Sequence, residues 1–96
     1  MNVFPKVEVV TSGGVSAGDA EHAGAVIRDV LAGTAASAQV TLSVLPDPGL
    51  PRPSLAQATV QQGLHRLRVQ AAAASPREAI ELLRRRLEVR TSVTTS

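Results

Sequence analysis

The sequence contains no cysteine, tryptophan or tyrosine, and Phe4 is its one aromatic residue. The absence of cysteine excludes disulfides and thiolate metal sites, and it is compatible with a reducing compartment. No apolar run approaches the ~18 residues that span a bilayer, and the N-terminus lacks the basic and then apolar pattern of a signal peptide. A chain of 96 residues folds around one modest core. We therefore expect a single soluble domain with no membrane partner.

The net charge of the chain is small, but it is unevenly distributed. Ten basic and eight acidic side chains give a formal charge of +2. Residues 1–50 carry two cations and five carboxylates, whereas residues 51–96 carry eight cations and three carboxylates. The two halves are thus −3 and +5. Nine of the ten cations are arginines, whose planar guanidinium groups stay charged and suit phosphate.

Hydrophobic periodicity predicts four strands and two helices. Alternation of polar and apolar residues predicts strands near 7–11, 39–44, 56–61 and 66–71, the last two joined by a hairpin turn at Gln62 and Gly63. The resulting order β-α-β-β-β-α predicts an α+β fold, a four-stranded mixed sheet with two helices packed on one face.

Capping signals delimit the two predicted helices. The first follows Ser16, whose partner three residues later is Asp19, and it ends near Leu31. The second follows Ser75, with proline next and glutamate at the third position, and it ends near Arg90.

Two segments are expected to lie outside the regular elements. Four prolines within residues 46–53 predict a long connection, in which Arg52 is interpreted as a solvated loop residue. Residues 91–96 lack periodicity and charge, which predicts the start of a flexible linker or a disordered tail. The expected domain therefore covers residues 1–90.

No constellation of residues points to catalysis. His22 and His65 lie on different elements, and neither has a carboxylate or a second histidine at the spacing of a metal site. Residues 12–16, before the first helix, match neither the GxxxxGK[ST] nor the GxGxxG phosphate-binding pattern, and Asp19 would repel a phosphate there. We expect no enzyme activity, no cofactor, no metal ion and no small-molecule substrate.

The remaining candidates for function are the arginines of the carboxy-terminal half. Arg84, Arg85 and Arg86 spread over about 200° of a helix, so the three do not all face one partner. Two interpretations stay open, a solvated face held by i,i+4 ion pairs and a phosphate-binding surface. The ion pairs would be Glu81 with Arg85 and Arg84 with Glu88. Because no aromatic residue is available to stack on bases, a phosphate-binding surface would recognise RNA by backbone and shape. The candidate RNA-binding residues are Arg66, Arg68, Arg77, Arg84, Arg85, Arg86 and Arg90.

Several segments of this half resemble a known family. They are ATV at 58–60, LRVQA at 67–71, AIELL at 79–83 and RL at 86–87. Without a gap, they are similar to the hairpin and final helix of ribosome hibernation-promoting factors, also called the ribosome-associated inhibitor or sigma-54 modulation family. Residues 40–44 resemble the family's second strand, and the resemblance covers about residues 6–90. The Ala- and Arg-rich composition resembles that of an actinobacterial member.

The resemblance implies a cytoplasmic protein that binds the small ribosomal subunit through ribosomal RNA and sterically blocks translation under stress or dormancy. Longer family members continue through a linker, so the resemblance also implies a second domain or dimer partner outside this chain. Arg86 matches the family's lysine before leucine. The sequence departs from the family in its first helix, where Arg28 is the one cation, and in the uncharged tail after Arg90.

Two other functions stay open at this point. A sheet backed by two helices also resembles a double-stranded-RNA-binding module, which would bind a plain RNA duplex without the ribosome. A protein-interaction domain could instead dimerise through the apolar shoulder formed by Leu82 and Val89.

Overall fold

The protein has the predicted element order and the predicted α+β fold. The computed structural model describes residues 5–34, 36–47 and 49–94, with side chains described to residue 90. The elements are β1 (Lys6–Ser12), α1 (Ala17–Val30), β2 (Ser37–Val44), β3 (Ser54–Gln62), β4 (His65–Ala73) and α2 (Pro76–Thr94).

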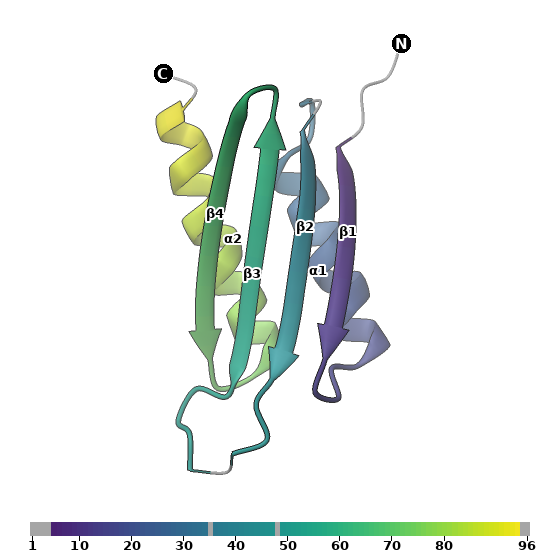
Figure 1. Ribbon diagram of the computed structural model, residues 1–96, viewed down its shortest axis with the longest axis vertical. Helices are drawn as coiled ribbons and strands as arrows, with labels where there is room; N and C mark the ends of the chain where they lie inside the picture. Colours follow the sequence, from purple (N-terminus) through teal and green to yellow (C-terminus); the bar gives the residue numbers. More distant parts are fainter. Residues whose placement is uncertain (1–4, 35, 48, 95–96) are drawn as a thin grey trace.

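The four strands form one mixed sheet in the order β1-β2-β3-β4 (Figure 1). β1 pairs with β2 in parallel, with α1 as the crossover between them, and the other two pairings are antiparallel. Both helices lie behind the sheet in Figure 1, α1 against β1 and β2 and α2 against β3 and β4. Among the described residues, no element covers the opposite face. The prediction of two helices on one face of the sheet is therefore confirmed.

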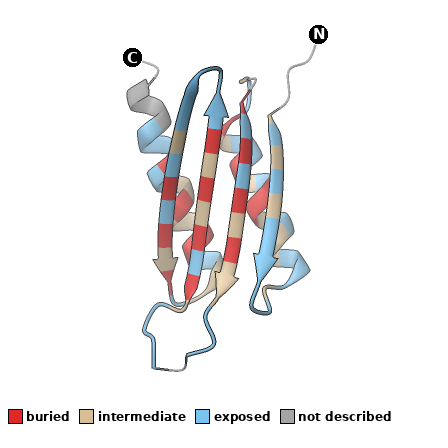
Figure 2. Cartoon of the chain, in the orientation of Figure 1, coloured by how far each residue is buried: buried red, intermediate tan, exposed pale blue. Residues whose placement is uncertain are grey.

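Small aliphatic residues build the core between the sheet and the helices. Figure 2 shows buried and more exposed residues alternating along β2, β3 and β4, as expected for a sheet with one covered face. Ile27 of α1 and Leu83 of α2 are fully buried against this face. Gly24 of α1 faces Val9 of β1, and a Cβ at this position would make an ordinary van der Waals contact with Cγ2 of Val9 at 3.5 Å. The buried strand residues are Ala38, Val40, Leu42, Ser54, Ala56, Ala58, Val60, Val69, Ala71 and Ala73.

Both helices begin at the predicted serine caps. The amide of Asp19 donates to Ser16 Oγ at 3.1 Å, and the amide of Glu78 donates to Ser75 Oγ at 3.3 Å. A cap of this kind stabilises a helix by about 1 kcal/mol. Along the part of the chain that the structure covers, neither helix is both long and apolar enough to cross a membrane.

The second helix is longer than the sequence predicts. It continues past Arg90 to Thr94, so the expected linker is helical over residues 91–94. Serine, threonine and valine cost no more than about 0.7 kcal/mol each relative to alanine in a helix, and an existing helix gains one backbone hydrogen bond for each added residue. No glycine or proline interrupts this segment. Residues 95 and 96 lie outside the described residues, and the division into a domain and a tail stays a prediction.

Substitution of Gly13 tests how tightly the turn after β1 packs. Gly13 has a φ of 74°, and a Cβ at this position would overlap the backbone carbonyl oxygen of Val44 at the end of β2. The strained backbone alone costs about 1–2 kcal/mol, and the overlap adds about 1–3 kcal/mol. Gly14→Ala is the matched control, because Gly14 has a φ of 82° but no neighbouring atom within 4 Å. We expect urea denaturation to show a clearly larger loss for Gly13→Ala, and equal losses would contradict the close packing.

Candidate nucleic-acid interface

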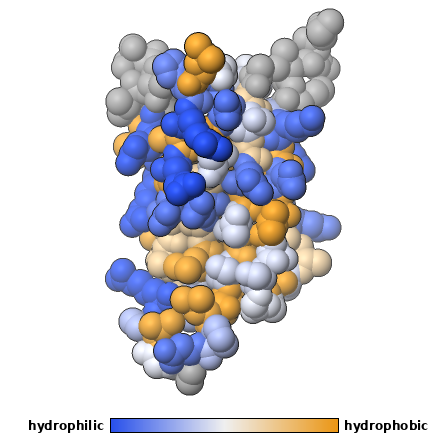
Figure 3. All heavy atoms as spheres, viewed as in Figure 1, coloured by the Kyte–Doolittle hydropathy of each residue, from blue (hydrophilic) through white to orange (hydrophobic). Residues whose placement is uncertain are grey.

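The uncovered face of the sheet presents polar side chains in rows that cross all four strands. Strands lie ~4.8 Å apart, so the side chains within a row are neighbours. We call this surface the open face; Figure 3 shows hydrophilic side chains gathered over its upper half. A hollow of about 400 Å³ lies between the first two rows. These rows are Lys6, Ser37, Gln61 and Arg66, and then Glu8, Gln39, Thr59 and Arg68.

Arg66 and Arg68 lie together on the open face. They are alternate residues of β4, about 7 Å apart along the strand, and both are exposed. Their cross-strand partners on β3 are the neutral Gln61 and Thr59. In the described structure neither guanidinium takes part in an ion pair or hydrogen bond, so both charges are available to a ligand.

Two of the predicted RNA-binding arginines are engaged by carboxylates on the side of α2 that faces α1. Nε of Arg77 lies 3.1 Å from Oδ1 of Asp19, which joins α2 to α1. Arg84 contacts two carboxylates of its own helix, Glu81 at 3.0 Å and Glu88 at 2.6 Å. The positive charges of Arg77 and Arg84 are thus compensated within the protein.

One predicted ion pair is wrong and the other is confirmed. Arg84 pairs with Glu88 as predicted, but Glu81 pairs with Arg84 at i,i+3 rather than with Arg85. Arg84 lies about one turn from each carboxylate, so its guanidinium engages both at once. His22 of α1 also approaches Glu81, with 3.4 Å between Nε2 and Oε1.

The ion pairs around Arg84 shift the protonation equilibria of its partners. The hydrogen bond from Arg84 holds the pKa of Glu81 below its ordinary value, and His22 adds a smaller effect in the same direction. Hydrogen bonds to Glu81 and then to Glu88 raise the pKa of Arg84. Both shifts favour the charged forms, so this cluster stays ion-paired at neutral pH.

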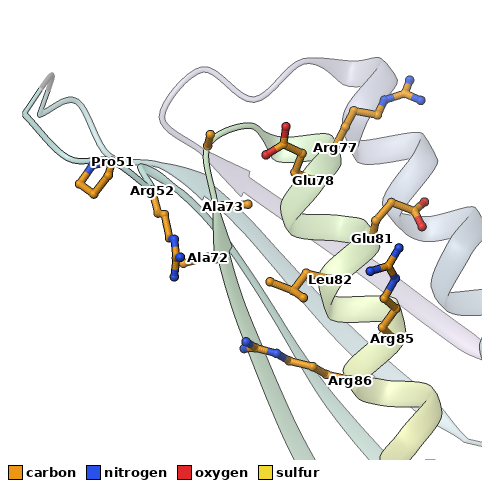
Figure 4. Close-up of a pocket in the computed structure, with 11 residues that line it drawn as sticks. Pro51, Arg52, Ala72, Ala73, Arg77, Glu78, Glu81, Leu82, Arg85 and Arg86 are labelled. Carbon is orange, nitrogen blue, oxygen red and sulfur yellow. The ribbon is translucent and has the colours of Figure 1, made fainter.

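The arginines that follow Arg84 lie elsewhere on α2. Nη1 of Arg86 donates to the backbone carbonyl of Gln70 on β4 at 2.6 Å, and its side chain reaches from α2 toward β4 in Figure 4. Because a carbonyl is neutral, Arg86 keeps its full positive charge. Arg85 is exposed, and no hydrogen bond or ion pair engages its side chain over the ranges that the structure describes. Arg90 is exposed one turn beyond Arg86.

The structure adds two cations that sequence reasoning did not place at a site. Lys6 of β1 stands in the same cross-strand row as Arg66. Arg52, interpreted as a solvated loop residue, lines a groove with Arg86 beside the end of β4. Neither position carries a local sequence signal. The pairing of β1 with β2 places Lys6, and the path of the proline-rich loop places Arg52. We use the name β4 arginines for Arg52, Arg66, Arg68 and Arg86.

The β4 arginines follow the strand from one end to the other. About seven residues of β4 separate the positions of Arg66 and Arg52, a distance of roughly 20 Å at ~3.3 Å per residue. A line of guanidinium groups of this length suits a phosphate backbone, since each group donates hydrogen bonds in a planar fork. No aromatic side chain among the described residues stands beside it to stack on bases. The arrangement can therefore bind a polyanion by charge and shape.

Comparison with solved structures identifies proteins of the same fold. No protein-family model matches the chain, and no curated protein sequence matches it. A ribosomal subunit interface protein from Coxiella burnetii matches with a TM-score of 0.73 and 13% sequence identity, over 94% of this chain and 97% of that chain. The N-terminal domain of Protein Y from Thermus thermophilus matches with a TM-score of 0.68 and 18% identity, over 94% of both chains. At these identities the similarity establishes the fold.

The pairing of Glu81 with Arg84 predicts a measurable pH dependence. We expect carbon-detected NMR titration to give Glu81 a pKa below the ordinary glutamate value of about 4.3. A carboxyl whose pKa is lower in the folded state stabilises the fold above its unfolded pKa, and this contribution is lost as pH falls through the folded pKa. The substitution Arg84→Ala should raise the pKa of Glu81 toward the ordinary value, with Arg85→Ala as the control that leaves it unchanged. If Arg85→Ala raised the pKa of Glu81 more than Arg84→Ala does, Glu81 would pair with Arg85, as the i,i+4 spacing predicts.

Proposed function

We propose that this protein is a ribosome hibernation factor domain, which binds the small ribosomal subunit through ribosomal RNA and blocks translation by occupying its site. The main support is the fold shared with a ribosomal subunit interface protein over 94% of the chain. The segments that resemble the hibernation family lie on β3, β4 and α2, and β4 and α2 also carry Arg66, Arg68 and Arg86. The proposed role would be exercised in the cytoplasm under stress or dormancy, without catalysis.

The charges of the described residues favour some of the predicted RNA anchors over others. Arg66, Arg68, Arg85 and Arg86 have no carboxylate partner among the described residues, so a phosphate meets their full charge. A phosphate that binds Arg77 or Arg84 would have to displace a carboxylate already in contact. We therefore assign the phosphate contacts to the first four, with Arg52 added from the structure. Arg77, Arg84 and Arg90 contribute less in this proposal.

Salt dependence provides the test of these contacts. Each phosphate contact that is removed lowers the slope of log affinity against log salt by about 1. We expect the double variant Arg66→Ala/Arg68→Ala to bind purified small subunits more weakly than the parent and to lose about 2 from this slope. Co-sedimentation over a range of salt concentrations measures both quantities.

The double variant Arg77→Ala/Arg84→Ala is the matched control, because it removes the same charge from the compensated side of α2. We expect it to change the slope by less than half as much. Equal slopes for the two variants would refute the assignment of anchors. Failure of the parent protein to co-sediment with small subunits at low salt would refute the function itself.

A plain RNA duplex of ~16 base pairs separates this function from the duplex-binding alternative. A hibernation factor requires the assembled subunit, so we expect the duplex to bind much more weakly than the subunit. Equal affinity for both would favour the double-stranded-RNA-binding module.

A further inference from the structure

A groove lies between α2 and the end of β4 that is remote from Arg66. Its volume is about 710 Å³, and Leu82 and Arg86 line it from the helix, as shown in Figure 4. A second hollow of about 240 Å³ lies on the neighbouring part of the open face and adds Leu55. Ala72 and Arg86 line both hollows, so the two meet around the end of β4. We call this combined surface the β4–α2 groove; its lining includes Pro51, Arg52, Leu55, Ala72, Leu82 and Arg86.

The floor of the β4–α2 groove is apolar. Leu55 is 38% exposed, and the side chains of Leu82 and Ala72 are half-buried. In Figure 3 hydrophobic residues gather in the lower half of the open face, apart from the hydrophilic upper half. Burial of apolar side chains on this floor is favourable. Placing a phosphate there would remove the charge from water without gaining such burial.

The rim of the groove is positively charged. Arg52 and Arg86 both line the groove, and Figure 4 shows Arg86 extending from α2 toward β4. The carboxylate of Glu81 is already engaged by Arg84 and His22, and Arg77 points toward α1. The remaining rim charges are Arg52, Arg85, Arg86 and Glu78, which leaves an excess of cations.

The backbone of β4 at this groove is the free edge of the sheet. The carbonyl of Gln70 points away from β3, because it accepts the hydrogen bond from Arg86. Strand geometry has a period of two, so the backbone groups of Arg68 and Ala72 also point outward. An extended peptide can hydrogen-bond such an edge and place alternate side chains into pockets. A charged side chain over the edge, here Arg86, keeps other strands away in the absence of a ligand.

We propose that the β4–α2 groove binds an extended acidic segment of a partner protein. The apolar side chains of the segment alternate along one of its faces and rest on Leu55 and Ala72, and its carboxylates pair with Arg52 and Arg86. The apolar floor and the strand edge favour a polypeptide over RNA, while the rim selects negative charge. This surface is distinct from the upper half of the open face, but it shares Arg52 and Arg86 with the proposed phosphate contacts. The acidic segment and ribosomal RNA would therefore compete for these two arginines.

A short capped peptide that alternates aspartate with leucine provides the probe. In two-dimensional amide NMR of the full chain, we expect its addition to shift signals of Gln70, Ala72 and Leu82 and to leave those of Lys6 and Arg66 unchanged. A peptide that alternates lysine with leucine, and one that alternates aspartate with serine, should bind at least about tenfold more weakly. Binding of all three peptides with equal affinity would overturn the proposal.

Matched substitutions locate the binding site. Arg86→Glu should weaken the aspartate–leucine peptide by about tenfold or more, whereas Arg28→Glu makes the same charge change on α1 and should not. Leu55→Asp should weaken it as well, with Val10→Asp as control, since Val10 is similarly exposed on the open face at 42%. Both positions are exposed, so the variants are expected to fold, and amide spectra check this directly.

Two other occupants give results that contradict the proposal. Single-stranded RNA that shifts the Ala72 and Leu82 signals at lower concentration than the acidic peptide would make the groove part of an RNA-binding surface. Signals of Leu55 and Leu82 that move with protein concentration, in the absence of peptide, would instead indicate a second copy of this chain. All these measurements are made without ribosomes, so their failure is separate from that of the proposed function.

Discussion

Burial of a single face of the sheet beneath both helices is the constraint on which the other features of this protein depend. Without an aromatic residue among the described core positions, the sheet packs against α1 and α2 through alanine, valine, leucine and isoleucine side chains. Because strand side chains alternate between faces, each buried residue fixes its neighbours on the open face. Arg66 and Arg68 are therefore held in solvent, because Val69 is buried and Leu67 partly buried on the other side.

The two helices also sort the charges of the chain. The acidic α1 lies beside the basic α2, and contacts such as Asp19 with Arg77 compensate charge between them. The cations on and beside β4 lie away from α1 and find no carboxylate among the described residues. The opposite charges of the two halves of the sequence therefore have two consequences. They join α1 to α2, and they leave a basic strip along β4. The same strip has a polar upper part and an apolar lower part, which suit different ligands.

Local sequence signals predicted the elements well, because they act within a few residues. The serine caps at Ser16 and Ser75, the hairpin near Gly63 and the alternation of β2, β3 and β4 all correspond to the structure. The end of α2 was the main error. Loss of amphipathic periodicity after Arg90 was interpreted as loss of helix, but a helix ends where its backbone cannot continue, and residues 91–94 contain nothing that stops it.

Composition and periodicity alone determined the α+β class, the one-sided sheet and the basic character of the carboxy-terminal half. Only the tertiary structure decided which arginines keep their charge available. Arg77 meets Asp19 from 58 positions away, and Arg86 reaches a carbonyl 16 positions away, so neither contact follows from sequence spacing. Arg52 and Lys6 likewise acquired their places from the loop path and the strand register. The reason is physical: periodicity sets the direction of a side chain, whereas its electrostatic environment depends on whichever residues the fold places opposite it.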